Sequence, residues 1–129
     1  MKMTKIDYGN LDNLPWQFVR EGITRKVFGM GAENINVTIN KVENGNEKNP
    51  HTHELNEQIA LILEGECDYY VDGVPYRMTK GSWITVPAGV EHYIEVYDSP
   101  VPVLNMDIFY PLREEYNESY GKFIENYRK

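Results

Sequence analysis

Polar and apolar residues alternate along several short segments, and that period of two is typical of β-strands. In residues 34–42, Ile35, Val37 and Ile39 share one face and Asn36, Thr38 and Asn40 share the other. Loop-forming residues separate these segments from one another. The pattern predicts strands within residues 16–19, 22–30, 34–42, 58–64, 66–78, 82–87, 92–97 and 101–110.

The connections between these segments support an all-β fold. Asp72-Gly73 is a turn pair that tolerates positive φ, so residues 66–78 are expected to form a hairpin. After Pro111 the pattern changes to that of a short helix, at about 112–127, with Gly121 as a weak point inside it. Residues 1–15 are expected to be an irregular lead-in. Many short strands in a small chain predict a sandwich or barrel, here a single domain over 1–129 with its barrel at about 20–110.

Composition narrows the range of partners. Of the 129 residues, 41% are hydrophobic and 26% charged, as in ordinary globular domains, and the formal net charge is −7. Nucleic acids and anionic membranes select basic surfaces, so neither is expected as a partner. Cys67 is the only cysteine, which excludes an internal disulfide and a cysteine-rich zinc site. A reducing cytoplasm is the expected location, since no signal peptide or membrane-spanning segment is evident.

The histidines carry the candidate chemistry. Two of the three, His51 and His53, are one residue apart and would point the same way on an extended segment, which Pro50 favours. His92 opens a later strand, after the turn residues Pro87 and Gly89. Two surface loop histidines are the plain alternative. However, three imidazoles at turn–strand junctions can converge on one metal ion.

The spacing around these histidines resembles that of the cupin family. Gly45, His51, His53 and Gly65 match the first cupin pattern, a glycine, five residues, H-x-H and then a strand ending at glycine. Gly81, Pro87, Gly89 and His92 match the second pattern, although Val96 stands where many cupins have asparagine. The resemblance implies a double-stranded β-helix, or jelly-roll, barrel with a short C-terminal helix outside it.

The fourth ligand position is ambiguous in the sequence. Three residues separate His53 from Glu57, whereas six separate Gln58 from Gly65, and both spacings occur in cupins. Neighbouring strand residues face opposite ways, so only one of the two can point inward. We favour Gln58, with Glu57 as the alternative. A neutral amide would leave the full charge on a divalent metal, and a glutamate would cancel part of that charge.

A second group of polar residues lies at the end of the last expected strand. Asn105, Asp107 and Phe109 share one face, a combination that suits a pocket wall better than a core. Arg113 follows at the expected helix start, where the helix dipole disfavours a cation, so it should have an acidic or anionic partner. The alternative is a surface ion pair for Arg113 and a capping role for Asp107.

The run D-x-F-x-P-x-R-E-E-Y, residues 107–116, resembles the C-terminal signature of small cupins of the KdgF family. Leu112, where relatives often have a second proline, departs from it. Members of that family linearise the unsaturated galacturonate released during pectin breakdown. The resemblance implies a metal held by His51, His53, Gln58 and His92. It also implies that Asp107, Phe109 and Arg113 act on a small anionic sugar.

Other functions are compatible with the same pattern. They are an iron dioxygenase, favoured if Glu57 is the ligand, a binding cupin without chemistry, and an aromatic polyketide cyclase. A metal-dependent, non-redox lyase or isomerase is the preferred hypothesis. Imidazoles accept zinc, nickel, manganese or iron, so the metal's identity stays open. Tyr69, Tyr76 and Trp83 are candidate apolar walls, and a homodimer is expected from strands with apolar residues on both faces.

Overall fold

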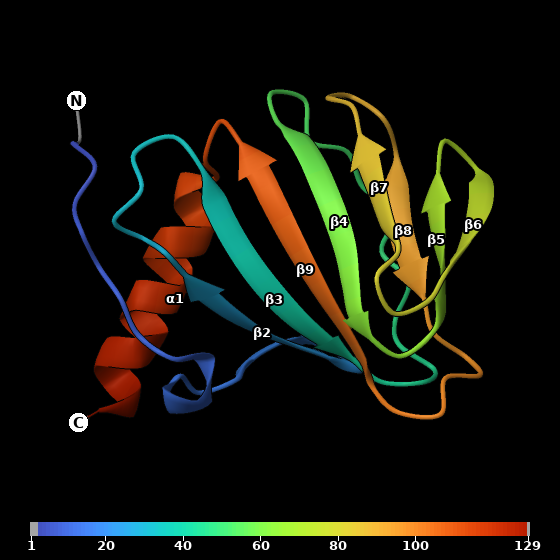
Figure 1. The fold of residues 1–129 in the computed structure, drawn as a ribbon, viewed down its shortest axis with the longest axis horizontal. Helices are drawn as coiled ribbons and strands as arrows, with labels where there is room; N and C mark the ends of the chain where they lie inside the picture. Colours follow the sequence, from blue (N-terminus) through green and yellow to red (C-terminus); the bar gives the residue numbers. More distant parts are fainter. Residues whose placement is uncertain (1–2, 129) are drawn as a thin grey trace.

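Two antiparallel sheets form the body of the protein, which we describe over residues 3–128 of a computed structural model (Figure 1). The larger sheet has the strand order β1-β2-β3-β9-β4-β7, and the smaller has the order β6-β5-β8. The strands are β1 (Gln17–Arg20), β2 (Ile23–Phe28), β3 (Asn36–Val42), β4 (Glu57–Glu64), β5 (Cys67–Val71), β6 (Val74–Met78), β7 (Trp83–Val86), β8 (His92–Glu95) and β9 (Val103–Tyr110).

The sheets form a jelly-roll barrel, which confirms the predicted all-β fold. Strand β9 lies between β3 and β4, although long stretches of sequence separate it from both. The β5–β6 hairpin turns at Asp72 (φ 52°) and Gly73 (φ 77°), as the turn pair predicts. Long-range pairing therefore brings the middle and the end of the chain together across one sheet.

The inner face of the larger sheet is hydrophobic near one end and polar toward the other. Near one end, Ile23, Val42, Ile62 and Val103 belong to the hydrophobic core, together with Cys67, Tyr69, Met78, Val86 and Val96. Toward the other end, Asn36 and Thr38 of β3 are buried, and so is Asp107 of β9. Buried polar side chains need hydrogen-bond partners, and two of these three, Thr38 and Asp107, line a pocket.

Gly65 directly follows β4, where the chain turns close to another strand. Its φ of +86° lies in the left-handed region, and an added Cβ would lie 2.9 Å from Cα of Val103. Glycine is therefore needed here both for its backbone conformation and for space.

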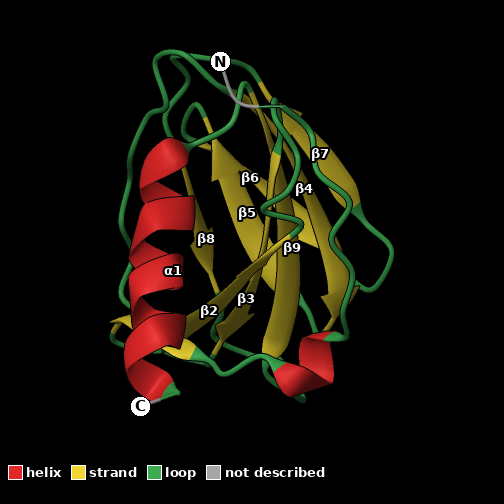
Figure 2. Ribbon diagram, turned by 90° about the vertical axis from the view of Figure 1, so that its left-hand side faces the viewer, coloured by secondary structure: helices red, strands yellow, loops and turns green. Residues whose placement is uncertain are grey.

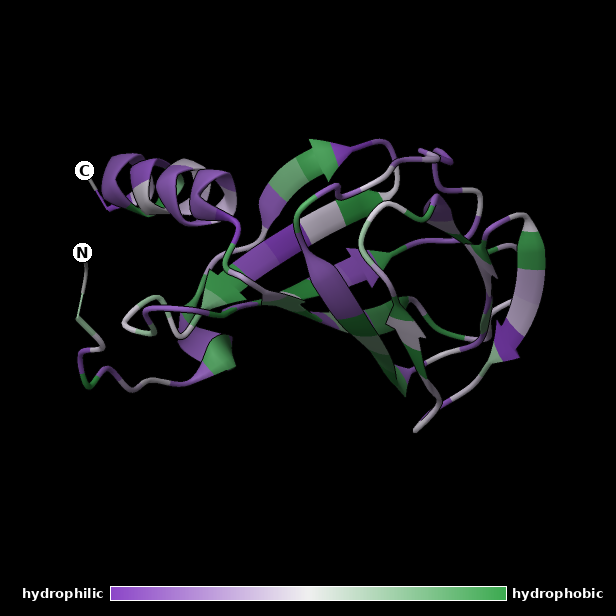
Figure 3. Cartoon of the chain, turned by 90° about the horizontal axis from the view of Figure 1, so that it is seen from above, coloured by the Kyte–Doolittle hydropathy of each residue, from purple (hydrophilic) through white to green (hydrophobic). Residues whose placement is uncertain are grey.

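A single long helix, α1 (Glu114–Tyr127), lies outside the barrel beside β2, as Figures 1 and 2 show. Tyr120, its buried residue, donates a hydrogen bond of 2.6 Å to the carbonyl oxygen of Pro15. Viewed from above, the helix presents a mostly hydrophilic surface away from the strands (Figure 3). Between residues 3 and 128, no helix is long and apolar enough to cross a membrane.

The N-terminal segment is irregular up to β1 except for a short 3-10 helix, Leu11–Asn13. Lys26 on the outer face of β2 donates a hydrogen bond of 2.6 Å to the carbonyl oxygen of Leu11, and its Nζ lies 4.4 Å from the Trp16 ring centroid. These contacts hold the lead-in against the outside of the larger sheet, away from the polar inner face.

Candidate metal centre and pocket

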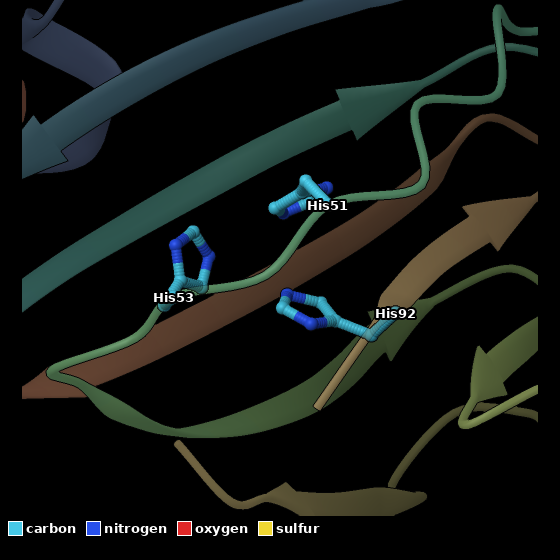
Figure 4. A group of neighbouring side chains, drawn as sticks. All are labelled: His51, His53 and His92. Atoms are coloured by element: carbon cyan, nitrogen blue, oxygen red, sulfur yellow. The ribbon is translucent and has the colours of Figure 1, made fainter. Parts of the chain in front are cut away.

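Three histidine rings face one another in the barrel (Figure 4). Their possible ligand atoms all lie within 4.8 Å of one another. His51 and His92 form an isolated bridge, in which each backbone N–H donates to the other's carbonyl oxygen, at 3.2 and 3.0 Å. The N–H of Gly89 donates to the carbonyl oxygen of His53 at 2.9 Å. Backbone hydrogen bonds therefore join the two histidine-bearing segments directly.

Hydrogen bonds to carbonyl oxygens orient two of the rings. Nδ1 of His51 lies 2.5 Å from the carbonyl oxygen of Asn49, and Nδ1 of His92 lies 3.0 Å from that of Val90. A carbonyl oxygen only accepts, so Nδ1 carries the proton in each ring and Nε2 keeps its lone pair. Burial lowers the pKa of both histidines, which favours the neutral imidazole that binds metals.

Gln58, and not Glu57, faces the histidines' side of β4. Gln58 is 3% exposed and lines the pocket, whereas the Glu57 side chain is exposed. The Nε2 amide of Gln58 donates to the hydroxyl of Tyr69 at 3.1 Å. The spacing back from Gly65 thus identified the inward residue, since alternation along the strand excludes its neighbour.

Two buried atoms of this cluster lack a hydrogen-bond partner among residues 3–128, Oε1 of Gln58 and Nε2 of His92. An unsatisfied buried acceptor costs about 1–3 kcal/mol, and native proteins rarely leave one without a reason. Imidazole nitrogens and an amide oxygen are suitable ligands for a divalent transition metal. The residues present therefore fit a metal site, with His51, His53, Gln58 and His92 available to hold the ion.

A pocket of about 300 Å³ opens beside the histidines and is lined by Asp107 of β9. The Asp107 carboxylate accepts hydrogen bonds from Nδ2 of Asn40 at 3.0 Å and from Nδ2 of Asn105 at 3.2 Å. Burial raises the pKa of Asp107 to about 6, and hydrogen bonds from Gln58, Asn105 and Asn40 oppose that shift. A carboxyl group with this pKa can both take up and release a proton near neutral pH.

Arg113 also lines the pocket and lies immediately before α1. Its guanidinium contacts the His53 ring, pairs with Glu115, and lies 5.9 Å from the ring centroid of Phe109. Arg113 thus has the acidic partner expected for a cation at a helix start, and it also borders the pocket. Phe109 is buried and packs edge-to-face on His53, with ring centroids 5.3 Å apart.

Of the aromatic residues suggested as pocket walls, Phe109 and Tyr69 line the pocket, whereas Tyr76 and Trp83 do not. Trp83 is 69% exposed on the outside of β7, and Tyr76 is exposed on the edge strand β6. The suggestion was wrong for these two because aromatic composition alone does not say which strand face turns inward. Sequence reasoning also missed Arg25 and Tyr116, which line the pocket. Alternation in β2 could have indicated Arg25, since it shares a face with the core residue Ile23.

The cupin domain family matches residues 39–109, which is more than half of the chain. The chain belongs to the cupin family. This cupin is 23% identical to the pectin degradation protein KdgF of Dickeya dadantii over 106 residues, which cover 81% of the chain and 93% of the relative. The family match over residues 39–109 includes both of the histidine motifs from which the cupin fold was predicted.

Solved structures give the same result. KdgF from a Halomonas species superposes with a TM-score of 0.76 at 25% identity, covering 85% of this cupin and 99% of that chain. An RmlC-like cupin from Shewanella frigidimarina superposes with a TM-score of 0.75 at 24% identity, covering 88% and 99%. The predicted resemblance to a small KdgF-like cupin is therefore confirmed.

Proposed function

We propose that this cupin is a metal-dependent, non-redox enzyme that opens the ring of a small unsaturated uronate such as 4,5-unsaturated galacturonate. The main support for this proposal is that Asp107, a buried carboxyl group with a pKa raised to about 6, lies in a pocket beside three converging histidines. The similarity to KdgF supports the choice of substrate. A pocket of about 300 Å³ is at the small end of ligand sites, which favours a monosaccharide-sized compound.

His51, His53, Gln58 and His92 are the proposed metal ligands. A divalent ion held by these four neutral groups would act as a Lewis acid toward sugar oxygens. Tyr69 would act as a positioning residue, because its hydroxyl accepts from Nε2 of Gln58 while Oε1 of the same amide has no partner among the described residues.

Asp107 is the proposed proton carrier. The reaction requires the anomeric hydroxyl to lose a proton while the bond between C1 and the ring oxygen breaks, which yields an aldehyde at C1 and an enolate at C5. The enolate then becomes a ketone as a proton is added at C4, and the ring double bond is lost. No oxidant or reductant is consumed. Asp107 can accept the first proton and supply the second, because amide groups of Asn40 and Asn105 hold its carboxylate in place.

Arg113 and Phe109 are proposed to hold the sugar. A guanidinium can pair with a uronate carboxylate through two parallel hydrogen bonds. Phe109 is buried between Gln58 and Asn36 of the neighbouring strands, so its ring forms a fixed apolar wall. Together they would orient the carboxylate away from Asp107 and keep water from the reacting carbons.

The proposal is tested by incubating metal-loaded protein with 4,5-unsaturated galacturonate and following the ultraviolet absorbance of the ring double bond. Loss of absorbance is expected for the natural chain. The Asp107→Ala variant is expected to bind metal fully and to lose activity by about 100-fold or more, as removal of a general acid–base does. Full turnover by that variant would contradict the role of Asp107.

Oxygen consumption with candidate substrates would instead support the dioxygenase alternative. Nothing in the position of Glu57 favours that alternative, because its side chain is exposed and outside the pocket lining. If the natural chain binds galacturonate without chemical change to the unsaturated sugar, a binding function would replace the enzymatic proposal. The homodimer and the cytoplasmic location stay predictions.

A further inference from the structure

Arg25 of β2 is a pocket cation without an acidic partner among the described residues. Its single hydrogen bond within residues 3–128 runs from Nη2 to Oε1 of Gln17 and is long, at 3.4 Å. The Nε atom is buried and has no partner in that same range. Burial lowers the pKa of Arg25, which reflects the unfavourable desolvation of its charge. A charged group in this state is expected to have a ligand.

The other two arginines of the pocket are paired. Arg20 lies 3.8 Å from Glu47, and Arg113 pairs with Glu115. Asp107 is the acid that lines the pocket, and its carboxylate accepts from asparagine amides rather than from a guanidinium. Among the described residues, Arg25 is therefore the guanidinium of the pocket lining that lacks an acidic partner. An unpaired cation in a cleft attracts anions.

Arg25 contacts Tyr116, and Tyr116 also contacts both residues proposed to hold the sugar, Arg113 and Phe109. The guanidinium carbon atoms of Arg25 and Arg113 each lie 4.7 Å from the ring centroid of Tyr116. Tyr116 lies in the first turn of α1 and packs on Phe109, with ring centroids 5.4 Å apart. Two cations from distant parts of the chain thus border one aromatic ring at the edge of the pocket.

We propose that Arg25 and Arg113 flank Tyr116 as an anion subsite for the ligand's carboxylate, and that Arg25 makes the site select carboxylated over neutral sugars. The choice of sugar rests on the proposed function, whereas the subsite does not require turnover. A carboxylate fits the planar fork of an arginine, and its binding would provide Arg25 with the partner that the described residues lack.

Binding is measured by calorimetry on metal-loaded protein with two probes, galacturonate and its neutral methyl ester. Arg25→Gln removes the charge, while Arg25→Lys keeps the charge and removes the fork. We expect Arg25→Gln to weaken galacturonate binding about 10- to 100-fold, as loss of a charged hydrogen bond does, and to change binding of the ester less than about twofold. Arg25→Lys should fall between the natural chain and Arg25→Gln.

Two results would overturn the subsite. They are unchanged galacturonate affinity in Arg25→Gln and equal weakening of both probes. Turnover of unsaturated galacturonate adds a separate readout, in which Arg25→Gln should raise KM and change kcat less than about threefold. If no turnover is seen but galacturonate binding still depends on Arg25, the proposed reaction fails and the subsite stands.

Discussion

Replacing Gln58 by leucine should weaken metal binding without destabilising the metal-free protein. In the metal-free protein the buried Oε1 of Gln58 lacks a partner among the described residues, which costs about 1–3 kcal/mol. The variant removes that cost and also loses the hydrogen bonds of the Gln58 amide to Tyr69 and Asp107, which contribute about 0.5–1.5 kcal/mol each. Metal-free Gln58→Leu should therefore be about as stable as the natural chain.

With metal present, the natural chain should be clearly more stable than Gln58→Leu. At a metal concentration 100-fold above Kd, binding stabilises the natural fold by about 2.7 kcal/mol, which raises Tm by roughly 10 °C for a domain of this size. If loss of the amide ligand weakens binding about 100-fold, Gln58→Leu gains only about 0.4 kcal/mol at the same concentration. Urea and thermal unfolding with and without Zn²⁺ or Ni²⁺ measure both effects.

Glu57→Gln is the matched control, since Glu57 is the adjacent residue with an exposed side chain. It should keep the full metal-induced rise in Tm. The reasoning would be refuted if Gln58→Leu lost more than about 1 kcal/mol without metal and kept the full rise. A loss of the rise in Glu57→Gln would assign the ligand position to Glu57 instead.

Three further predictions concern the fold itself. Gly65→Ala should lower the free energy of unfolding by about 2–4 kcal/mol in urea titrations, because the left-handed backbone and the close Cα of Val103 both oppose a side chain; a loss below 1 kcal/mol would contradict this. Gly121→Ala should raise it by about 0.5–1 kcal/mol, since no atom outside the helix backbone lies within 4 Å of the new methyl group. The fully buried Cys67, whose pKa burial raises to about 12, should resist a thiol reagent at pH 8 until urea unfolds the chain; rapid labelling of the folded protein would disagree.

Local pattern was sufficient to predict most of the fold. The alternation in residues 34–42 and 101–110 indicated β3 and β9, and the Asp72-Gly73 pair indicated the β5–β6 turn. Strand order could not be derived in the same way, because pairing of β9 with both β3 and β4 depends on contacts far apart in the chain. The cupin resemblance supplied that order.

The sequence indicated some residues of the candidate site and missed others. The histidines could be found because glycine and proline spacing determines where the strands begin. Alternation left Glu57 and Gln58 undecided, since both faces of β4 carry apolar residues, and the spacing to Gly65 favoured the residue that lines the pocket. Alternation in β2 could have indicated that Arg25 faces inward, but its contact with Tyr116, which Arg113 shares, depends on the far end of the chain. The ligand set and the catalytic roles stay proposals.

The reciprocal backbone bridge between His51 and His92 has a consequence for how this protein can vary. Main-chain groups, which every residue type supplies, hold these two imidazoles in register. The exposed neighbours Thr52 and Glu91 can therefore be exchanged without moving the rings. Substitutions at these positions, in evolution or by design, could change the charge around the histidines and the access of ligands to them while the arrangement of the His51 and His92 rings stays the same.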